Sequence, residues 1–444
     1  MPRRQRTIVL CFDGTSDQYS SANTNVVKLC SLLEKDNERQ VVYYQARHKP
    51  FCTPAAGIGT YISPSVASPP LQWCARILDE AFAIFLATHV MQGYKFLMQN
   101  FNIGDRVCLF GFSRGAYTAR ALAGMLHKVG LLGKDNNEQV PFAYKLYKSN
   151  KPEDAVTAAG FKQTFCREVP IDFVGVWDTV SSVGVIVGPT LPFVQTNNTI
   201  RTFRHALSLD EHRAKFRPSF YVRSVPPGSK SLPWLGRLRH GIRRLVRCSP
   251  QTPSNETEQT IADVGKGLKG SLRSSPPSAF ETDVKEVWFA GCHSDVGGGN
   301  ALNTAQYALA NIPLRWMVRE VMQAECSIAW EETAFAQLGI PFEVPGPQDI
   351  QSSDAPDAEQ KLTDELVVVP AWWLLEIVPT NYTYQDVKTN KWVSEWSIHL
   401  GRGRWVPESP TTNFHSSVKQ RMDNVQLKYE PRARYKQDRV VYTD

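Results

Sequence analysis

Short apolar segments alternate with stretches of helical periodicity over the first 135 residues, and this pattern strongly restricts the fold. Residues 7–12 (TIVLCF), 40–44 and 105–110 (DRVCLF) have the length and composition of buried strands. Residues 25–33 and 73–98 lie between them and place apolar side chains at helical spacing. Parallel strands need a long crossover, usually a helix, so the alternation predicts βαβ units and a mostly parallel sheet.

Two further apolar segments continue the pattern. Residues 171–177 (IDFVGVW) and 284–290 (VKEVWFA) predict strands that end directly before Asp178 and shortly before His293. The sequence therefore predicts an α/β fold of the α/β-hydrolase type, with a mostly parallel sheet flanked by helices, insertions and a C-terminal extension.

Composition divides the chain into a catalytic domain, 1–325, and a C-terminal extension, 326–444. Within the first, residues from about 225 to 280 are rich in Ser, Pro, Gly and basic side chains, which predicts a flexible insertion. The Trp-rich section 371–405 would expose a large apolar surface if it stood alone. We therefore expect the extension to pack on the main domain.

Composition also bounds the class of protein. The 42% of apolar residues indicates a globular chain, and a net charge of +7 is modest for 444 residues. This modest charge does not by itself argue for nucleic acid as a partner. The run Gly297-Gly298-Gly299 is not a G-x-G-x-x-G and the chain has no P-loop, so nucleotide binding is not expected either. The nine cysteines are scattered and form no C-x-x-C pair, which favours reduced thiols in a cytoplasmic protein over a disulfide framework or a zinc site.

No segment predicts insertion into a membrane. The apolar run at 7–12 is too short for a signal peptide, and the longest lipophilic stretch, near 81–87, is far below the roughly 18 residues that span a bilayer. In the insertion, residues 230–248 alternate basic and apolar side chains, which fits peripheral contact with an anionic membrane surface. A solvated charged linker explains the same segment equally well.

The strongest local signal is Gly111-Phe112-Ser113-Arg114-Gly115, which fits G-x-S-x-G between a predicted strand and a predicted helix. A sharp strand-to-helix turn crowds the backbone, so the positions two residues on either side of the serine must be small. The turn also places Ser113 at a helix N-terminus, where the backbone N–H of Arg114 is the expected first donor of an oxyanion hole. Because such pentapeptides also occur by chance, the partners of Ser113 matter.

A nucleophilic serine needs a base and an orienting carboxylate, which follow it in the order acid, then histidine in this fold. Asp178 and His293 each follow a predicted strand in that order. His415 is the rival base, but no strongly apolar strand leads into it. Asp295 is expected to shape the loop beside His293 rather than to act as the acid.

The turn Asp13-Gly14-Thr15 follows the first predicted strand. This is where the fold takes its second oxyanion donor, so Gly14 and Thr15 are candidates and Asp13 is expected to support the site. An ordinary turn capped by Asp13 is the alternative. Elsewhere, the segment HALSLDEHR (205–213) looks like an acidic surface helix, with His205 and His212 at its flanks.

With these motifs in place, the chain resembles the α/β-hydrolase domain of bacterial type VI secretion phospholipase effectors and their uncharacterised fungal relatives. The resemblance extends over about residues 7–320. It rests on FDGTSD with TNVVKL, AGIGTY, GFSRGAYTARALAGML, FVGVWDTVSSVG, HALSLDEHRAKFRP, and VWFAGCHSDVGGG followed by IPLRWMV. It matches Ser113, Asp178 and His293 to the family's triad and implies esterase activity, of phospholipase type in the bacterial members. In two places the chain departs from the family: an apparent insertion at 46–55, and a C-terminal third unlike the bacterial membrane-docking region.

The favoured hypothesis is thus a serine esterase that cleaves lipid or phospholipid esters through an acyl-enzyme, without metal or organic cofactor. A hydrolase of small esters or thioesters, and a catalytically inactive binding protein with the same fold, remain alternatives.

Overall fold

The structure is a computed structural model. It describes residues 5–14, 19–35, 37–46, 86–180, 191–221, 281–377, 380–385, 392–407 and 411–444, with the backbone alone at 380–385 and 392–397. The chain divides into two compact units, 1–221 with 282–444, and 222–281; the central sheet and the candidate site residues belong to the first of these. Several predicted features lie outside the described residues: the insertion at about 225–280 with its basic segment 230–248, nearly all of the stretch 46–55, and Thr15.

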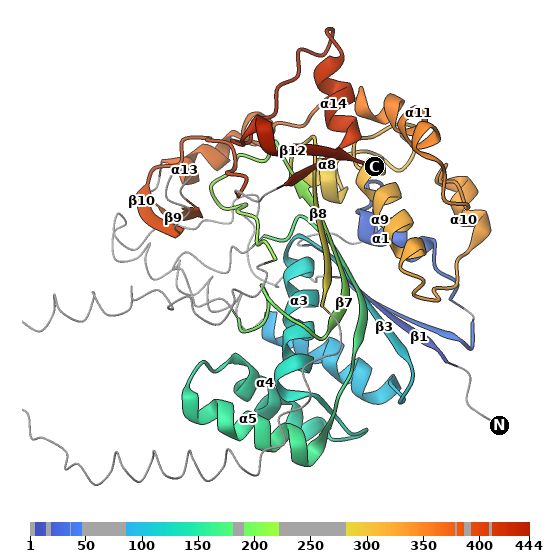
Figure 1. The fold of residues 1–444 in the computed structure, drawn as a ribbon, viewed down its shortest axis with the longest axis vertical. Coiled ribbons are helices and arrows are strands. Elements are labelled where there is room, and N and C mark those ends of the chain that lie inside the picture. Colours follow the sequence, from blue (N-terminus) through green and yellow to red (C-terminus); the bar gives the residue numbers. More distant parts are fainter. Residues whose placement is uncertain are drawn as a thin grey trace, which may run out of the picture. The chain divides into compact units, whose positions relative to one another are not determined.

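An eight-stranded sheet forms the centre of this unit (Figure 1). Its order is β2-β1-β3-β6-β7-β8-β11-β12, and every pairing within it is parallel. The α/β fold predicted from the strand and helix alternation is therefore confirmed. The strands are β1 (Thr7–Phe12), β2 (Gln40–Gln45), β3 (Arg106–Phe112), β6 (Ile171–Trp177), β7 (Ile200–Ser208), β8 (Asp283–Phe289), β11 (Thr412–His415) and β12 (Val440–Thr443).

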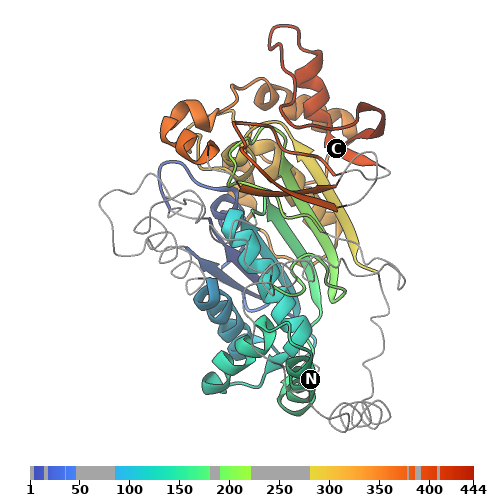
Figure 2. The same cartoon turned by 90° about the vertical axis from the view of Figure 1, so that its left-hand side faces the viewer.

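Helices cover both faces of the sheet, because its central strands are apolar on both sides (Figures 1 and 2). Leu109 of β3 belongs to the core on one face and Phe110 to the core on the other. The first face is covered by the helix at 86–100 and by α3 (Ser113–Val129), α4 (Val140–Lys148) and α5 (Pro152–Phe165); the second by α1 (Asn25–Ser31) and α9 (Asn311–Gln323).

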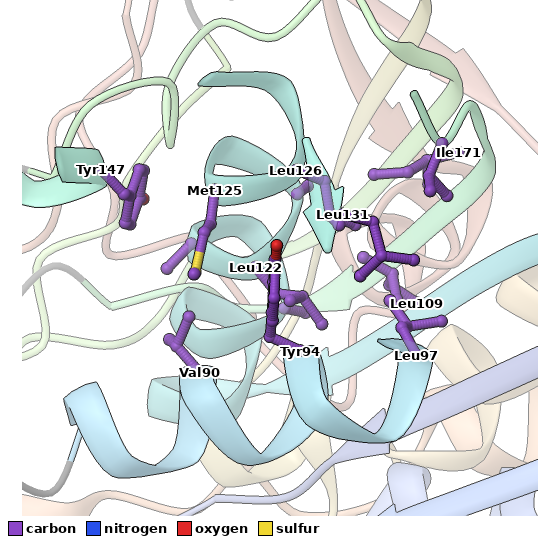
Figure 3. Packing of buried hydrophobic residues seen from close by; sticks show 14 of the residues in the cluster. Val90, Tyr94, Leu97, Leu109, Leu122, Met125, Leu126, Leu131, Tyr147 and Ile171 are labelled. Carbon is purple, nitrogen blue, oxygen red and sulfur yellow. The ribbon is translucent and has the colours of Figure 1, made fainter. Parts of the chain in front are cut away.

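The helix α3 is buried almost all round, because the helix at 86–100 packs beside it on the sheet and α4 and α5 pack on it as well (Figure 3). Leu122 and Met125 of α3 lie against Val90 and Tyr94 of that helix (Figure 3). The buried Tyr94 hydroxyl donates to the carbonyl oxygen of Gly130 at 2.9 Å, which satisfies its polar group inside the core. This packing holds α3, and with it Ser113, rigidly against the sheet.

The C-terminal part of the chain completes the sheet. It supplies β11 and β12, so the sequence-based boundary at 325 falls between strands of one sheet. Its other elements are α10 (Glu332–Gln337), α11 (Pro347–Ala358), α12 (Glu365–Val368), α13 (Trp373–Glu376), α14 (Ser416–Asp423) and the hairpin β9–β10 (Thr380–Gln385 and Trp392–Ser397). Two short strands, β4 (Leu131–Leu132) and β5 (Cys166–Arg167), pair beside α3.

One expectation about local structure is wrong. The segment 205–213 is no surface helix: residues 205–208 end the central strand β7, and 209–213 form a buried loop. This strand carries Arg204, which is ion-paired with Glu320, and His205, which is hydrogen-bonded to Glu286, so it lacks the apolar run that marks a buried strand. A short strand, β11, leads into His415, but its sequence TNFH is not strongly apolar, as expected.

Candidate active site

The candidate residues gather where the order of the sheet reverses. The strands β1 and β3 are neighbours, but β1 leads to α1 on one face of the sheet and β3 leads to α3 on the other. In parallel α/β sheets, ligands bind outside the carboxyl ends of the strands at such a switch point. Asp13 follows β1 and Ser113 follows β3 at this edge.

Ser113 lies on a strained turn between β3 and α3. Its φ of 59° is in the left-handed region, which non-glycine residues enter at a cost of about 1–3 kcal/mol. Gly115 permits the turn, since a Cβ there would overlap the backbone carbonyl oxygens of Phe12 and Asp13. A Cβ on Gly111 would lie 2.6 Å from the carbonyl oxygen of Gly115. Gly115 is thus required by the close approach of α3 to β1, and Gly111 by the tight turn from β3 into α3.

The structure brings Ser113, His293 and Asp178 into one chain of hydrogen bonds. His293 opens α8 (His293–Gly297) after β8, and its Nε2 lies 2.8 Å from Ser113 Oγ. Its Nδ1 lies 2.5 Å from Oδ2 of Asp178, which follows β6. The carboxylate can only accept, so Nδ1 carries the proton and Nε2 accepts from the serine hydroxyl. This arrangement lets the imidazole remove the hydroxyl proton.

The surroundings of His293 keep it neutral. Burial lowers the pKa of its imidazole below the ordinary value, although the hydrogen bond to Asp178 acts in the opposite direction. The rings of Phe112 and Phe216 lie 4.6 Å and 4.9 Å from the imidazole centroid and exclude water from it. A neutral imidazole is the form that acts as a base.

Asp178 remains ionised despite being fully buried. Burial alone would raise the pKa of its carboxyl, but the charge of Arg404 and the hydrogen bonds from His293 and Arg404 outweigh it and hold the pKa well below its usual range. The Arg404 guanidinium donates to both carboxylate oxygens, at 2.6 and 2.8 Å. The sequence reasoning missed Arg404, because 226 residues separate it from Asp178 and no local pattern marks it.

A second carboxylate, Glu211, also reaches the site, from the loop that was misread as a surface helix. Its Oε2 accepts from the backbone N–H of His293 at 3.2 Å and from Arg213 at 2.7 Å. Burial would raise the pKa of Glu211, yet the charge of Arg213 lowers it to about 2. The Arg213 guanidinium in turn lies 3.6 Å above the ring of Phe216. This pair therefore holds the start of α8 and one of the rings beside His293.

The candidate oxyanion donors are arranged less simply. The Gly14 N–H donates to Asp13 Oδ1 at 2.7 Å. In this conformation the N–H is therefore already bound to the Asp13 side chain and does not face an oxyanion. Asp13 also accepts from Thr24 and Tyr44, each at 2.8–2.9 Å, and burial raises the pKa of its carboxyl. Arg114 is the second residue of α3, directly after Ser113.

The remaining candidates lie apart from the reacting atoms. Asp295 accepts from the backbone N–H groups of Cys292 and Thr363, each at 3.0 Å, and so joins the start of α8 to the C-terminal part. His415 is fully buried, and its ring stacks on Phe289 at 4.8 Å. Its Nδ1 contacts Ser417 at 2.9 Å, so the structure does not bring it to Ser113.

Within the described ranges, no three or more His, Cys, Asp or Glu side chains form a group that could hold a metal ion. Among the helices of those same ranges, none combines the length and the apolar character needed to cross a bilayer.

Comparison with known proteins identifies relatives. Residues 6–320 match the family model described as the type VI secretion system phospholipase effector Tle1-like catalytic domain. An uncharacterized protein of Saccharomyces cerevisiae is 28% identical, over 93% of this chain and 78% of its own length. Ser113, Asp178 and His293 lie within the matched region, whereas Arg404 lies beyond it.

Two solved structures are more distant. An uncharacterized protein from Pseudomonas aeruginosa has a TM-score of 0.37 and 16% identity, over 85% of this chain and 56% of that one. The Tle1 effector, solved bound to the VgrG spike of the type VI secretion system, has a TM-score of 0.37 and 13% identity, over 90% of each chain. At this level neither likeness bears on function.

Proposed function

The chain belongs to the family of Tle1-like phospholipase effector catalytic domains, and we propose from this that it is a serine hydrolase of carboxylic esters in lipids or phospholipids. Family membership supports a lipid hydrolase in general. The observation that carries the mechanism is the chain of hydrogen bonds from Ser113 through His293 to Asp178. We assign these residues as nucleophile, general base and orienting carboxylate.

In the first half-reaction, Ser113 Oγ attacks the ester carbonyl carbon while His293 Nε2 takes the hydroxyl proton. Asp178 stabilises the imidazolium that forms. The tetrahedral intermediate then collapses: its C–O bond to the alcohol breaks, His293 returns the proton to the leaving oxygen, and the acyl group stays on Ser113.

In the second half-reaction, water attacks the acyl-enzyme. His293 takes a proton from the water, and the new tetrahedral intermediate collapses to the free fatty acid. The proton returns to Ser113 Oγ, which restores the starting state.

The developing oxyanion needs two or more N–H donors. We assign the first to the backbone N–H of Arg114, since it follows the nucleophile at the N-terminus of α3. For the second, Gly14 and Thr15 remain candidates. Gly14 qualifies only after its N–H leaves Asp13 Oδ1, so we propose that substrate binding shifts the loop after β1.

An exposed apolar face beside His293 supports a lipid rather than a small soluble substrate. The face lies on α12, the turn at 370–372, α13 and the loop 398–400. Its exposed members are Val367, Val368, Trp373, Leu374, Ile377, Ile398 and Leu400. Trp372, in the same segment, packs edge-on against Phe216 at 5.6 Å, and Phe216 contacts His293. Exposed apolar side chains on a segment that is linked to the base through Trp372 and Phe216 suit a substrate held in a lipid surface.

The charges around this apolar face also suit an anionic lipid surface. Of the carboxylates in residues 364–377, Asp364 is ion-paired with Arg432 and Glu365 with Arg213, and Glu376 is hydrogen-bonded to His399. Lys361 and Arg402, at the edges of the same face, are exposed. Anionic lipids would therefore meet basic rather than acidic side chains.

A fluorophosphonate probe tests the mechanism. We expect covalent labelling of the folded wild-type protein and its loss in Ser113→Ala. Absence of Ser113-dependent labelling in folded protein would overturn the enzyme proposal in favour of an inactive binding protein.

A substrate comparison tests the lipid assignment. Leu374→Gln with Ile377→Gln should slow hydrolysis of phosphatidylglycerol vesicles and leave turnover of a short soluble ester unchanged. Val425→Gln is the matched control, because Val425 is also exposed but lies on a different loop. Fast turnover of the soluble ester with none of the vesicles would instead favour the small-ester alternative.

A further inference from the structure

Arg404, from the loop after β10, makes a two-point ion pair with Asp178. Nη1 donates to Oδ1 at 2.6 Å and Nη2 donates to Oδ2 at 2.8 Å. Such bidentate pairs fix the plane of the carboxylate as well as its position. Arg404 is itself buried, with 6% of its surface exposed, so water does not compete for these bonds.

The guanidinium has five N–H donors, and the structure uses all of them. Besides the two bonds to Asp178, Nη1 donates to the carbonyl oxygen of Ser208 at 3.0 Å. Nη2 and Nε both donate to the carbonyl oxygen of Phe216, at 2.6 and 3.1 Å. Arg404 therefore joins Asp178, the end of β7 and the loop that carries Phe216. A lysine has one ammonium group and cannot reach these acceptors together.

The backbone around Arg404 is held as firmly as its side chain. The carbonyl oxygen of Arg404 accepts from the N–H of Arg434 at 2.7 Å, and Val406 donates to the carbonyl oxygen of Arg434 at 2.9 Å. A Cβ on Gly403 would overlap the carbonyl oxygen of Arg432, so only glycine allows the two segments to approach this closely. The guanidinium is thus preorganised rather than recruited by Asp178.

Asp178 has a full set of donors as a result. His293 Nδ1 donates to Oδ2, the backbone N–H of Ser208 donates to Oδ1, and Arg404 donates to both. Loss of Arg404 would leave a buried carboxylate held by only two donors and free to rotate. It would also leave the carboxylate charge uncompensated beside the imidazole.

We propose that Arg404 is a positioning residue that holds Asp178 in the orientation required by His293. The C-terminal part of the chain, beyond the matched residues 6–320, then completes the active site. This inference rests on the proposed function, since it concerns how that reaction is supported.

The test measures ester hydrolysis by Arg404→Gln, Arg404→Lys and Arg404→Ala in the full chain. We expect kcat to fall on the order of 10²-fold in each, with KM changed by less than about twofold, because substrate does not touch Arg404. In Arg404→Gln the acid limb of the kcat profile should move to higher pH, because an uncompensated Asp178 raises the pKa of His293. Millimolar guanidinium should partly restore Arg404→Ala, whereas it should not change the wild type.

Arg421→Gln is the matched control. Arg421 is another buried arginine of the C-terminal part, which donates to the carbonyl oxygen of Gln360 at 2.7 Å and does not contact Asp178. We expect it to lower Tm and leave the acid limb in place. If the Arg404 variants behave like Arg421→Gln per folded molecule, with no shift of the limb and no guanidinium rescue, the inference is overturned. Retention of hydrolysis by Ser113→Ala would instead overturn the proposed function.

Discussion

His293 follows β8 and His415 ends the neighbouring strand β11, and each has a serine and an arginine-bound aspartate beside it. Around His293 the contacts are 2.8 Å to Ser113 and 2.5 Å to Asp178. Around His415 they are 2.9 Å to Ser417 and 3.8 Å to Asp354, whose carboxylate is bound by Arg315. The two sites thus hold the same residue types in different geometry.

The difference lies in which ring nitrogen meets the serine and in what the backbone does there. His415 Nδ1 also accepts from the backbone N–H of Ser417 and so caps the start of α14, while its Nε2 has no hydrogen-bond partner among the described residues. Ser113 has the strained left-handed φ of a strand-to-helix turn, and Ser417 does not. A Ser, His and Asp close together are therefore not sufficient. The carboxylate must be hydrogen-bonded to one imidazole nitrogen, and the other nitrogen must accept from the serine hydroxyl rather than from a backbone N–H.

The largest expected effect separates the two histidines. His293→Gln should reduce turnover by 10³-fold or more, by order of magnitude, because no base remains for Ser113. His415→Gln should retain turnover within a few-fold per folded molecule. The rate of ester hydrolysis, normalised to the folded fraction from circular dichroism, measures both effects. A larger loss of turnover in His415→Gln than in His293→Gln would contradict the assignment of His293 as the base.

Asp178 and Asp354, the aspartates beside His293 and His415, should likewise differ in their effect on turnover. Asp178→Asn should lower kcat by about 10³-fold or more, since the amide cannot hold the imidazole in the required tautomer. Asp354→Asn leaves Arg315 with one anionic partner fewer, Asp357 remaining, so it should cost about 3 kcal/mol of unfolding free energy with kcat preserved. Urea denaturation beside kinetics separates these outcomes, and a loss of kcat in folded Asp354→Asn would contradict the division of roles.

Protonation of His293 at low pH should reduce the rate of ester hydrolysis. Burial lowers the pKa of His293, so kcat/KM should fall on acidification only as the pH drops through a pKa below the ordinary value of about 6.5. A profile of kcat/KM against pH in a soluble ester assay measures this limb. A midpoint above the ordinary value of about 6.5 would contradict the prediction.

Acidification should also lower the free energy of unfolding, because of His415. Burial holds the pKa of His415 well below 6.5, so on acidification the unfolded chain binds a proton that the folded chain does not. The free energy of unfolding should therefore fall below about pH 6.5, by at most about 1.4 kcal/mol per pH unit from this group. His415→Gln should make that slope shallower, and an unchanged slope would exclude the contribution.

The smallest effect concerns the serine beside His415. Ser417→Ala should cost about 1 kcal/mol or less, because it removes one hydrogen bond near the start of α14. Fluorophosphonate labelling should be the same as in the wild type, in contrast to Ser113→Ala. Thermal denaturation and labelling together check this, and reduced labelling of the folded variant would place a second reactive serine in the chain.

Local sequence was sufficient for the strands that are apolar along their length. β1 spans Thr7–Phe12 and β6 spans Ile171–Trp177, as their apolar runs predict, because a strand buried on both faces carries few polar side chains. β7 was missed because its polar residues are satisfied by distant partners, an ion pair of Arg204 with Glu320 and a hydrogen bond of His205 with Glu286, which no local window contains. β11 was missed because it has only four residues.

What the sequence by itself determined is the strand-to-helix turn at Ser113 and the order in which Asp178 and His293 follow their strands. Each is a local property, since glycine spacing and apolar runs act within a few residues. Only the tertiary structure decided that Arg404 and Glu211 belong to the site. It also decided that the Gly14 N–H is hydrogen-bonded to Asp13 and that His415 caps a helix. Such contacts depend on how buried charges from distant segments find partners, and chain folding rather than spacing brings those segments together.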